Sequence, residues 1–330
     1  MKDDAKYKTE DISVVIPTYK RAADVKETLK HLVRVVDELC EDIIVDQSPD
    51  NETKNLVKEL KNKKIKYIFS RIPSTAIARN MGIKSANKKS KIICFIDDDV
   101  TIGEDYFKEI IRVFNTHPNV KGCAIYDPAS GYKDGRLYLL LKKIFFIGRR
   151  EGERADLVST YGNLYPQGLK DIKNAQWFPG LNTAYIKTIF DEQVFDENLL
   201  GYSTIEDMDF SYRIWKKYPK SLFITPFAGI IHRASPVERN PTKKMAYVNQ
   251  VEKFYFQYKD INKRIFDLKF IWVLMGILLL RTSQFVYTRK KIDALKLKFF
   301  ISSTLYCLIN LDLIRAGKVR EFLNDPRFNE

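Results

Sequence analysis

The sequence has few of the residues that mark a disulfide-rich or zinc-scaffold protein. It contains four cysteines and three histidines among 330 residues. The cysteines (Cys40, Cys94, Cys123 and Cys307) are scattered, with no C-x-x-C pair and no metal-ligand spacing. Scattered cysteines are typical of free thiols in a reducing compartment, so a secreted disulfide framework is excluded.

Long apolar runs are also missing. The N-terminus, MKDDAKYKTED, has no apolar stretch, so we expect no secretory signal and a fold that begins in the cytosol. Two apolar runs lie near the C-terminus, at 270–280 and 299–311, and the first has only 11 residues. A spanning helix needs about 20 apolar residues, so neither run predicts a clear transmembrane helix.

The composition that is present is globular and basic. Hydrophobic residues make up 45% and charged residues 30%, which argues against disorder. The formal charge is +14, and residues 241–330 hold 17 Lys+Arg against 8 Asp+Glu. Such a segment can bind nucleic acid, an anionic membrane or an acidic substrate. Its apolar runs, with Trp272, Tyr287 and Tyr306 nearby, favour a helical hairpin in the membrane interface over a buried helical pair packed on the preceding domain.

Strand and helix patterns alternate over the first 126 residues. This alternation predicts βαβ units on a mainly parallel sheet. In such sheets ligands bind at the carboxyl ends of the strands, which places Thr18, Asp46 and residues 97–99 along one edge. We predict strands at 12–17, 42–46, 65–69, 91–96 and 120–126, and helices at 22–39, 51–61, 75–86 and 104–114.

The remaining residues divide into two regions. Residues 127–176 are rich in Gly and Tyr with weak periodicity, and we expect an irregular insertion. A helix at 205–217 and a strand at 222–225 follow, and another helix pattern covers 248–258. The predicted organisation is a main domain at 1–240, in two halves (11–126 and 127–240), then a basic, apolar helical region at 241–330.

Three consecutive carboxylates follow the predicted strand at 91–96. Asp97, Asp98 and Asp99 repel one another at a strand end unless a cation neutralises them. Mg²⁺ and Mn²⁺ favour carboxylate oxygens and complete their shells with waters and substrate phosphates, so a pyrophosphate site fits here. The alternative is a solvated acidic turn before the next helix, helped by Glu104 and Asp105.

The acidic motif belongs to an ordered series. SVVIPTYKR, DIIVDQSPDNET, STAIARNMGI, FIDDDV, WFPGLNTAY and IEDMDFSYRIWKK follow one another between about residues 11 and 235. This series resembles the family 2 glycosyltransferases. The resemblance implies a GT-A catalytic domain at 1–240, with a nucleotide-binding half (11–126) and an acceptor half (127–240), so the insertion would lie on the acceptor side. It also implies Mn²⁺ or Mg²⁺ and the inverting transfer of a sugar from a nucleotide diphosphate sugar to an acceptor hydroxyl. Such transfer would serve polysaccharide, glycolipid or glycoprotein glycan assembly. The Q-x-x-R-W element of the processive members is missing, which argues for single additions.

The resemblance also implies roles for individual residues. Glu206 and Asp207 match the catalytic pair, with Asp207 as the base, and a carboxylate can take the proton of a sugar hydroxyl. The other assignments are Pro17, Thr18, Tyr19, Asp46, Arg79, Asp97 and Asp98 for the nucleotide, Asp97, Asp99 and His232 for the metal, and Trp177, Gly180 and Asn182 for the donor sugar and acceptor. Each of these assignments has a structural alternative. Glu206 and Asp207 could simply favour a helix N-terminus, and His232 could be a structural hydrogen-bonding residue. The segment at 177–182 could be a loop that closes the core.

Two other functions remain to be weighed. A nucleotidyltransferase would usually carry a Gly-rich phosphate loop after the first strand, where Thr18 to Arg21 contain no glycine. A nucleic-acid-binding protein would interleave basic and aromatic residues without an 11-residue apolar block. We therefore expect a nucleotide sugar and a glycan or lipid-linked acceptor as partners, and no nucleic acid. We also expect a peripheral or monotopic position on an anionic membrane surface, at the cytoplasmic side of the cell membrane.

Overall fold

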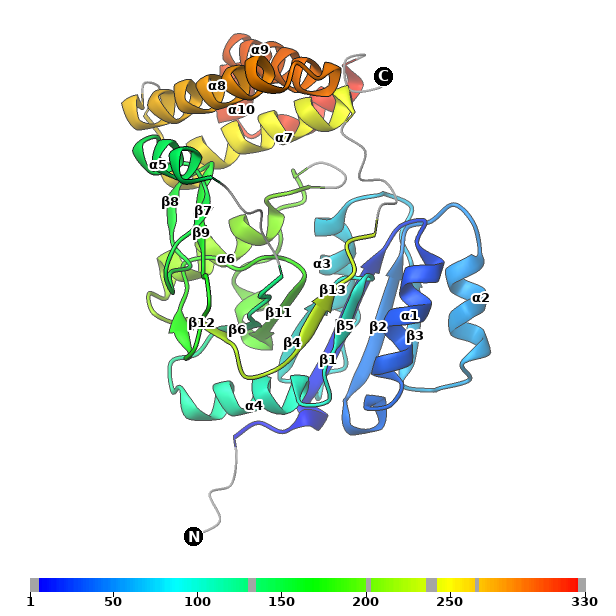
Figure 1. Cartoon of the computed structure of the whole chain (residues 1–330). Coiled ribbons are helices and arrows are strands. Elements are labelled where there is room, and N and C mark those ends of the chain that lie inside the picture. The colour runs from blue at the N-terminus through cyan, green and yellow to red at the C-terminus, as the bar shows by residue number, and fades with distance from the viewer. Residues whose placement is uncertain (1–5, 130–134, 200–202, 236–241, 265–266, 326–330) are drawn as a thin grey trace.

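The computed structural model of the chain describes residues 6–129, 135–199, 203–235, 242–264 and 267–325. An eight-stranded sheet forms its centre, and C-terminal helices form a layer on one side of it (Figure 1). The strand order is β10–β12–β6–β11–β4–β1–β2–β3. The strands are β1 (Ile12–Thr18), β2 (Glu41–Asp46), β3 (Ile65–Phe69), β4 (Ile92–Ile96), β6 (Gly122–Ile125), β10 (Lys173–Asn174), β11 (Asn182–Ile186) and β12 (Leu222–Thr225).

The N-terminal half of this sheet is parallel, as the alternating pattern predicts. β1 pairs in parallel with β2 and β4, and β2 pairs in parallel with β3. β1 runs from the N-terminal end of the molecule toward the C-terminal helices (Figure 1), so the carboxyl ends of these strands face that helical layer. The connecting helices are α1 (Ala22–Leu32), α2 (Glu52–Glu59), α3 (Thr75–Ser85) and α4 (Tyr106–Thr116).

The other half makes the sheet mixed rather than mainly parallel. β11 pairs antiparallel with both β4 and β6, and β10 pairs antiparallel with β12. After β6 the chain passes through the insertion and enters β11 from the end of the sheet at which β6 finishes. β11 is therefore antiparallel to its two neighbours, β4 and β6. The helix predicted at 22–39 is also too long, because α1 ends at Leu32. The valines at 33, 35 and 36 are β-branched and disfavour its continuation.

The insertion is more regular than its sequence predicts. It contains the helix α5 (Arg136–Ile144) and a small three-stranded sheet of order β7–β9–β8. Strands of two to four residues are too short to show a period, which explains why the prediction of an irregular segment is wrong here. These strands are β7 (Arg149–Arg150), β8 (Leu157–Ser159) and β9 (Gly162–Tyr165).

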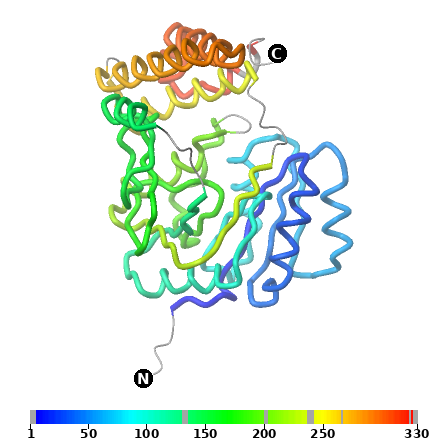
Figure 2. Tube along the Cα trace, viewed as in Figure 1, coloured from blue at the N-terminus to red at the C-terminus, as the bar shows by residue number. Residues whose placement is uncertain are grey.

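The C-terminal helices pack on the catalytic part of the chain (Figure 2). In α7 the side chains of Val251, Phe254 and Phe256 are fully buried and belong to the same hydrophobic core as the strands. The change of composition near residue 240 is thus not a break in the packing. The helices of this region are α7 (Lys243–Phe256), α8 (Leu268–Thr288), α9 (Lys291–Ile309) and α10 (Leu311–Arg315).

The helix α8 is longer than the apolar run at 270–280 that predicts it. It begins after Asp267, whose side chain caps the amides of Lys269 and Phe270, and it ends at Arg289, which adopts a left-handed backbone. Its 21 residues make it long and apolar enough to cross a membrane by length and composition. The apolar run at 270–280 is thus the central part of a helix that is longer than the run itself.

One buried carboxyl in β2 gives a prediction about stability. Asp42 is fully buried, its oxygens have no hydrogen-bond partner in the described ranges, and burial raises its pKa to about 8. A raised pKa means that the folded state holds a proton the unfolded state has lost. Wild-type stability should therefore fall between pH 5 and 8, by at most about 1.4 kcal/mol per pH unit from this group. Asp42→Asn should remove that part of the fall.

The measurement is chemical denaturation of both proteins across this pH range. Asp50→Asn, at an exposed loop carboxylate, is the matched control and should follow the wild-type curve. Parallel pH profiles for wild type and Asp42→Asn would contradict the assignment of a raised pKa to this carboxyl.

Candidate active site

The three consecutive carboxylates lie between β4 and the short strand β5 (Val100–Ile102). Asp98 points inward, where it accepts hydrogen bonds from Thr18 Oγ1 at 2.8 Å and Arg21 Nη1 at 3.2 Å. Burial raises the pKa of Asp98 to about 7, while Arg21 opposes the shift. Asp98 therefore ties the loop after β1 to the loop after β4. The assignment of Asp98 to the nucleotide stays a prediction, and in this structure its carboxylate contacts Thr18 and Arg21 inside the protein.

Asp99 meets His232 at this edge of the sheet. The strand β13 (Ile230–His232) pairs antiparallel with β5 and sets His232 opposite Val100. As a result His232 Nε2 lies 3.3 Å from Asp99 Oδ1, and the other carboxylate oxygen accepts the amide of Ser235 at 2.9 Å. The sequence separates Asp99 and His232 by more than 130 residues, and the β5–β13 ribbon brings them together.

This pair fits a divalent cation. Oxygen and nitrogen ligands bind such an ion at about 2.0–2.2 Å, so neighbouring ligands of one ion lie about 3 Å apart. A carboxylate and an imidazole at 3.3 Å match that spacing. The predicted third ligand, Asp97, is not gathered with them. In the parts of the chain that the structure describes, no three His, Cys, Asp or Glu side chains form a metal-binding group.

Asp97 instead lies toward Arg79, whose Nη2 is 3.5 Å from Asp97 Oδ1. The Asp97 side chain keeps 32% of its surface exposed, in contrast to the buried side chains of Asp98 and Asp99. Asp97 is thus the member of the motif that an approaching ligand can reach. This matches its predicted position beside the nucleotide better than its predicted place on the metal.

Arg79, on α3, is the central cation of the site. Its guanidinium is buried and donates to Glu206 at 3.3 Å, to Asp207, and to the carbonyl of Gly180 at 3.2 Å. It also lies over the ring of Phe195 at 5.2 Å. The sequence assigns Arg79 to the nucleotide, but its contacts here are with carboxylates, so it positions the acidic groups.

The acidic pair begins α6 (Glu206–Lys217), where the helix N-terminus favours negative charge. The Glu206 side chain is 5% exposed, and burial raises its pKa although Arg79 opposes the shift. Asp207 is 19% exposed and lies against Gly180, where an added Cβ would overlap its carboxylate. Gly180 therefore leaves the space that Asp207 occupies. Of the two carboxylates, Asp207 is the one that faces outward.

The predicted nucleotide residues near β1 and β2 differ in exposure. Pro17 and Tyr19 are half-buried at the end of β1. Asp46 is fully buried and accepts hydrogen bonds from Tyr67 Oη at 3.0 Å and from the amide of Ser48 at 2.9 Å. Asp46 thus orders the turn after β2, and Pro17 and Tyr19 offer the accessible surface.

Two residues assigned to the sugar make contacts inside the protein. Trp177 is buried and its indole donates to the carbonyl of Leu164 at 3.0 Å. Asn182 is fully buried and exchanges hydrogen bonds with the backbone of Ile125 at 2.8 and 3.2 Å. Both side chains hydrogen-bond to backbone groups inside the protein, whereas Gly180 lies against Asp207. The assignment of Trp177 and Asn182 to the sugar stays a prediction.

Sequence reasoning missed two arginines that support the acidic loop. Arg21 pairs with Asp98, as described above, and follows the loop after β1 directly. The guanidinium of Arg233 donates to Thr101 at 2.6 Å, Thr28 at 2.8 Å and the carbonyl of Asp98 at 3.2 Å. The sequence signal for these arginines is their position close to predicted site residues, since Arg21 is two residues after Tyr19 and Arg233 directly follows His232.

The chain carries an acidic loop, a histidine and a helix-borne carboxylate at the carboxyl edge of its sheet, and it has the GT-A fold. Residues 13–165 match the family described as glycosyl transferase family 2. This match covers a little less than half of the chain, and it confirms the resemblance seen in the motifs.

Individual relatives agree at the level of family and fold. The chain is 30% identical over 132 residues to validoxylamine A glucosyltransferase of Streptomyces hygroscopicus subsp. jinggangensis, a match that covers 37% of this chain and 31% of that protein. It is 32% identical over 103 residues to an uncharacterized glycosyltransferase of Rickettsia conorii, covering 31% of this chain and 16% of the relative. The matched segments thus span a third or less of these relatives. Crystal structures of S. aureus TarS residues 1–349, alone and with UDP-GlcNAc, superpose with a TM-score of 0.50 at 18% and 16% identity, covering 94% of this chain and 88% of TarS.

Proposed function

We propose that this chain is an inverting, non-processive glycosyltransferase that moves one sugar from a nucleotide diphosphate donor to an acceptor hydroxyl. The observation that carries the proposal is the accessible carboxylate of Asp207, held by Arg79 against Gly180 at the acidic edge of the sheet. The family match favours sugar transfer over the nucleotidyltransferase and nucleic-acid-binding alternatives. The complex of TarS with UDP-GlcNAc supports a nucleotide sugar as the donor class.

The chemistry needs one base and one stabilised leaving group. Asp207 takes the proton of the acceptor hydroxyl while that oxygen forms a bond to the anomeric carbon. The bond from the anomeric carbon to the diphosphate breaks in the same displacement, and its electron pair stays on the diphosphate oxygen. Attack from the face opposite the leaving group inverts the anomeric configuration.

The residues that would hold a cation are Asp99 and His232. We assign Asp97, the exposed member of the acidic motif, to the ribose of the nucleotide. When bound, Mn²⁺ or Mg²⁺ supplies positive charge for the diphosphate oxygens as they become the leaving group. Pro17 and Tyr19 provide the accessible side chains at the end of β1, and we assign them to the nucleotide. Arg79 fixes Asp207 and Glu206 during the reaction.

The acceptor belongs at a membrane. We propose a lipid-linked or membrane-proximal glycan acceptor at the cytoplasmic face, because residues 241–330, with 17 Lys+Arg against 8 Asp+Glu, hold nine of the +14 net charges and expose many apolar side chains. The carboxyl ends of the parallel strands face the same helical layer (Figure 1), which supports an acceptor delivered from that side.

A donor-binding experiment tests the cation site. The wild-type protein is titrated with UDP-, GDP- and other nucleotide sugars with Mn²⁺, with Mg²⁺ and with chelator, and binding is followed by calorimetry. Asp99→Ala should lose most of the metal-dependent gain in donor affinity, since it removes one of two protein ligands, whereas its affinity in chelator should stay that of wild type.

Asp105→Ala, at an exposed acid of the following loop, is the matched control and should bind like wild type. Turnover with lipid and glycan acceptors is measured on the same three proteins. Absence of turnover on every nucleotide sugar with either ion, or equal metal dependence in all three proteins, would contradict the proposal.

A further inference from the structure

The helix α8 is apolar on two opposite faces. Phe270, Val273 and Leu280 are buried against the protein. On the other side, apolar side chains recur at the spacing of one helical face and are exposed to solvent. They are Ile271, Trp272, Met275, Leu278, Leu279 and Val286. A helix that is apolar on both sides needs a partner for the side that the fold leaves open.

Two further helices expose apolar stripes next to it. In α9 the exposed residues follow the spacing i, i+4, i+7 and i+8, and every residue of α5 is at least partly exposed. The stripe residues are Ile301, Leu305, Leu308 and Ile309 in α9, and Leu137, Leu140 and Ile144 in α5. We call the exposed apolar side of α5, α8 and α9 the helical face.

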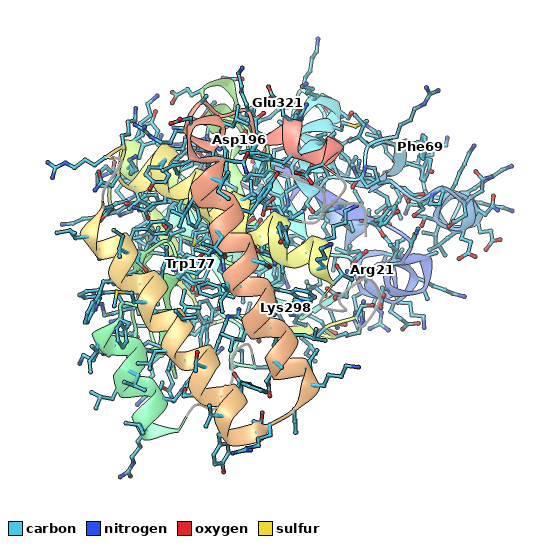
Figure 3. The ribbon with its side chains drawn as sticks, turned by 90° about the horizontal axis from the view of Figure 1, so that it is seen from above. Arg21, Phe69, Trp177, Asp196, Lys298 and Glu321 are labelled. Atoms are coloured by element: carbon cyan, nitrogen blue, oxygen red, sulfur yellow. The ribbon has the colours of Figure 1, made fainter. Side chains whose placement is uncertain are left out.

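The helix α5 is fixed to α8 although about 130 residues separate them in the chain. The indole of Trp272 donates to the carbonyl of Ile144 at 3.0 Å, and the rings of Phe145 and Trp272 lie 4.8 Å apart. Gly276 leaves room for Phe145, since a Cβ there would overlap that side chain. Seen from above, the three helices form the outer layer of the molecule, and Lys298 of α9 lies on this side (Figure 3).

The charges on these elements have almost entirely one sign. Residues 136–144 and 268–309 together contain ten Lys+Arg and one acidic residue, Asp293. That carboxylate is buried and accepts hydrogen bonds from Gln284 at 3.0 Å and Thr288 at 2.7 Å. The helical face therefore combines apolar side chains with cations, which is complementary to anionic headgroups above an acyl layer.

We propose that the helical face docks in the plane of an anionic lipid bilayer, with α5 of the insertion as an integral part of the docking surface. This inference deepens the proposed membrane location and does not depend on sugar transfer. A second copy of the chain is a poorer partner, because two such faces would bring like charges together. A spanning orientation of α8 is disfavoured, because its other face packs against the protein and α5 lies along it.

Vesicle co-sedimentation of the full-length protein tests the proposal. The protein is mixed with vesicles of phosphatidylcholine alone or with added phosphatidylserine. Wild type should bind the anionic vesicles, and added salt should weaken the binding. The double variant Met275→Glu/Leu279→Glu should lose at least about tenfold in partitioning, since it removes two apolar side chains and adds two negative charges. Leu137→Glu/Leu140→Glu should lose several-fold if α5 takes part.

The control is Val194→Glu, at an exposed apolar residue of the catalytic part, which should bind like wild type. Equal vesicle binding by all variants, or none by wild type, would overturn the proposal. Self-association that the same substitutions abolish, without vesicle binding, would assign the face to a second copy instead.

Donor hydrolysis and transfer to a water-soluble acceptor are measured on the same proteins, to separate docking from catalysis. Turnover without vesicle binding defeats the docking proposal alone. Vesicle binding without turnover on any nucleotide sugar defeats the proposed function alone.

Discussion

Asp207→Asn is expected to abolish sugar transfer while donor binding stays close to that of wild type. The amide keeps the shape of the carboxylate and fits beside Gly180, but it cannot accept the proton of the acceptor hydroxyl. Loss of a positioned general base costs about 10²–10⁴-fold in rate. We expect the upper part of this range in kcat, since Glu206 is too buried to replace Asp207.

The measurement is the initial rate of transfer under saturating donor, together with the calorimetric affinity for the donor. Asp191→Asn, at an exposed carboxylate outside the site, is the matched control and should keep full activity. If Asp207→Asn retained transfer within tenfold of wild type, Asp207 would not be the base. A parallel collapse of donor affinity would instead show that Asp207 holds the donor.

The parts of the fold that sequence predicts well are those with continuous apolar strands. β1, β2 and β4 are almost entirely buried, so each contains an uninterrupted run of at least three apolar residues and leads to a polar residue at the sheet edge. The antiparallel insertion of β11 could not be predicted, because its direction depends on where the preceding chain ends. The strands β7 to β9 are too short for any period to appear.

The sequence predicts which residue types gather at the candidate site better than it predicts which of them contact one another. Asp99 with His232 and Glu206 with Asp207 meet at one edge, as the ordered motifs indicate. Burial decides the other roles, and a motif does not report burial. Asp98 looks identical to its neighbours in the sequence, yet its carboxylate points inward to Arg21. The same holds for Arg79, which faces carboxylates that lie far away in the chain.

The catalytic helix α6 is also held from its far side by the C-terminal region. Lys259 follows α7 and contacts three carboxylates: Asp196 at 2.7 Å, Asp260 at 3.3 Å and Asp209. Burial alone would lower the pKa of Lys259, but these carboxylates raise it above its ordinary value. Asp209 lies two residues after Asp207, so this cluster links the helical layer to the start of α6.

Lys259→Met should therefore destabilise the protein more than loss of an ordinary surface charge. It removes one of the two cations of the buried Asp209, whose other oxygen still pairs with Arg213 at 3.0 Å, and it leaves this carboxylate beside Asp260, whose pKa burial already raises to about 6. Removing one partner of a buried ion pair costs about 3–5 kcal/mol, which is the upper bound here. Lys216→Met is the matched control, because the Lys216 side chain is 45% exposed and its ion pair with Asp260 is long, at 3.9 Å between Nζ and Oδ1. It should cost about 0–1 kcal/mol.

Urea unfolding of the three proteins measures the difference. Transfer activity of the surviving folded Lys259→Met protein should fall as well, since α6 loses the contact that holds its first turn. Equal unfolding midpoints for Lys259→Met and Lys216→Met would mean that the cluster contributes no more than a surface ion pair. In that case the helical layer would be joined to the rest of the chain by its other contacts, such as the packing of Phe254 and Phe256 of α7 and the hydrogen bond from Ser203 to Glu252.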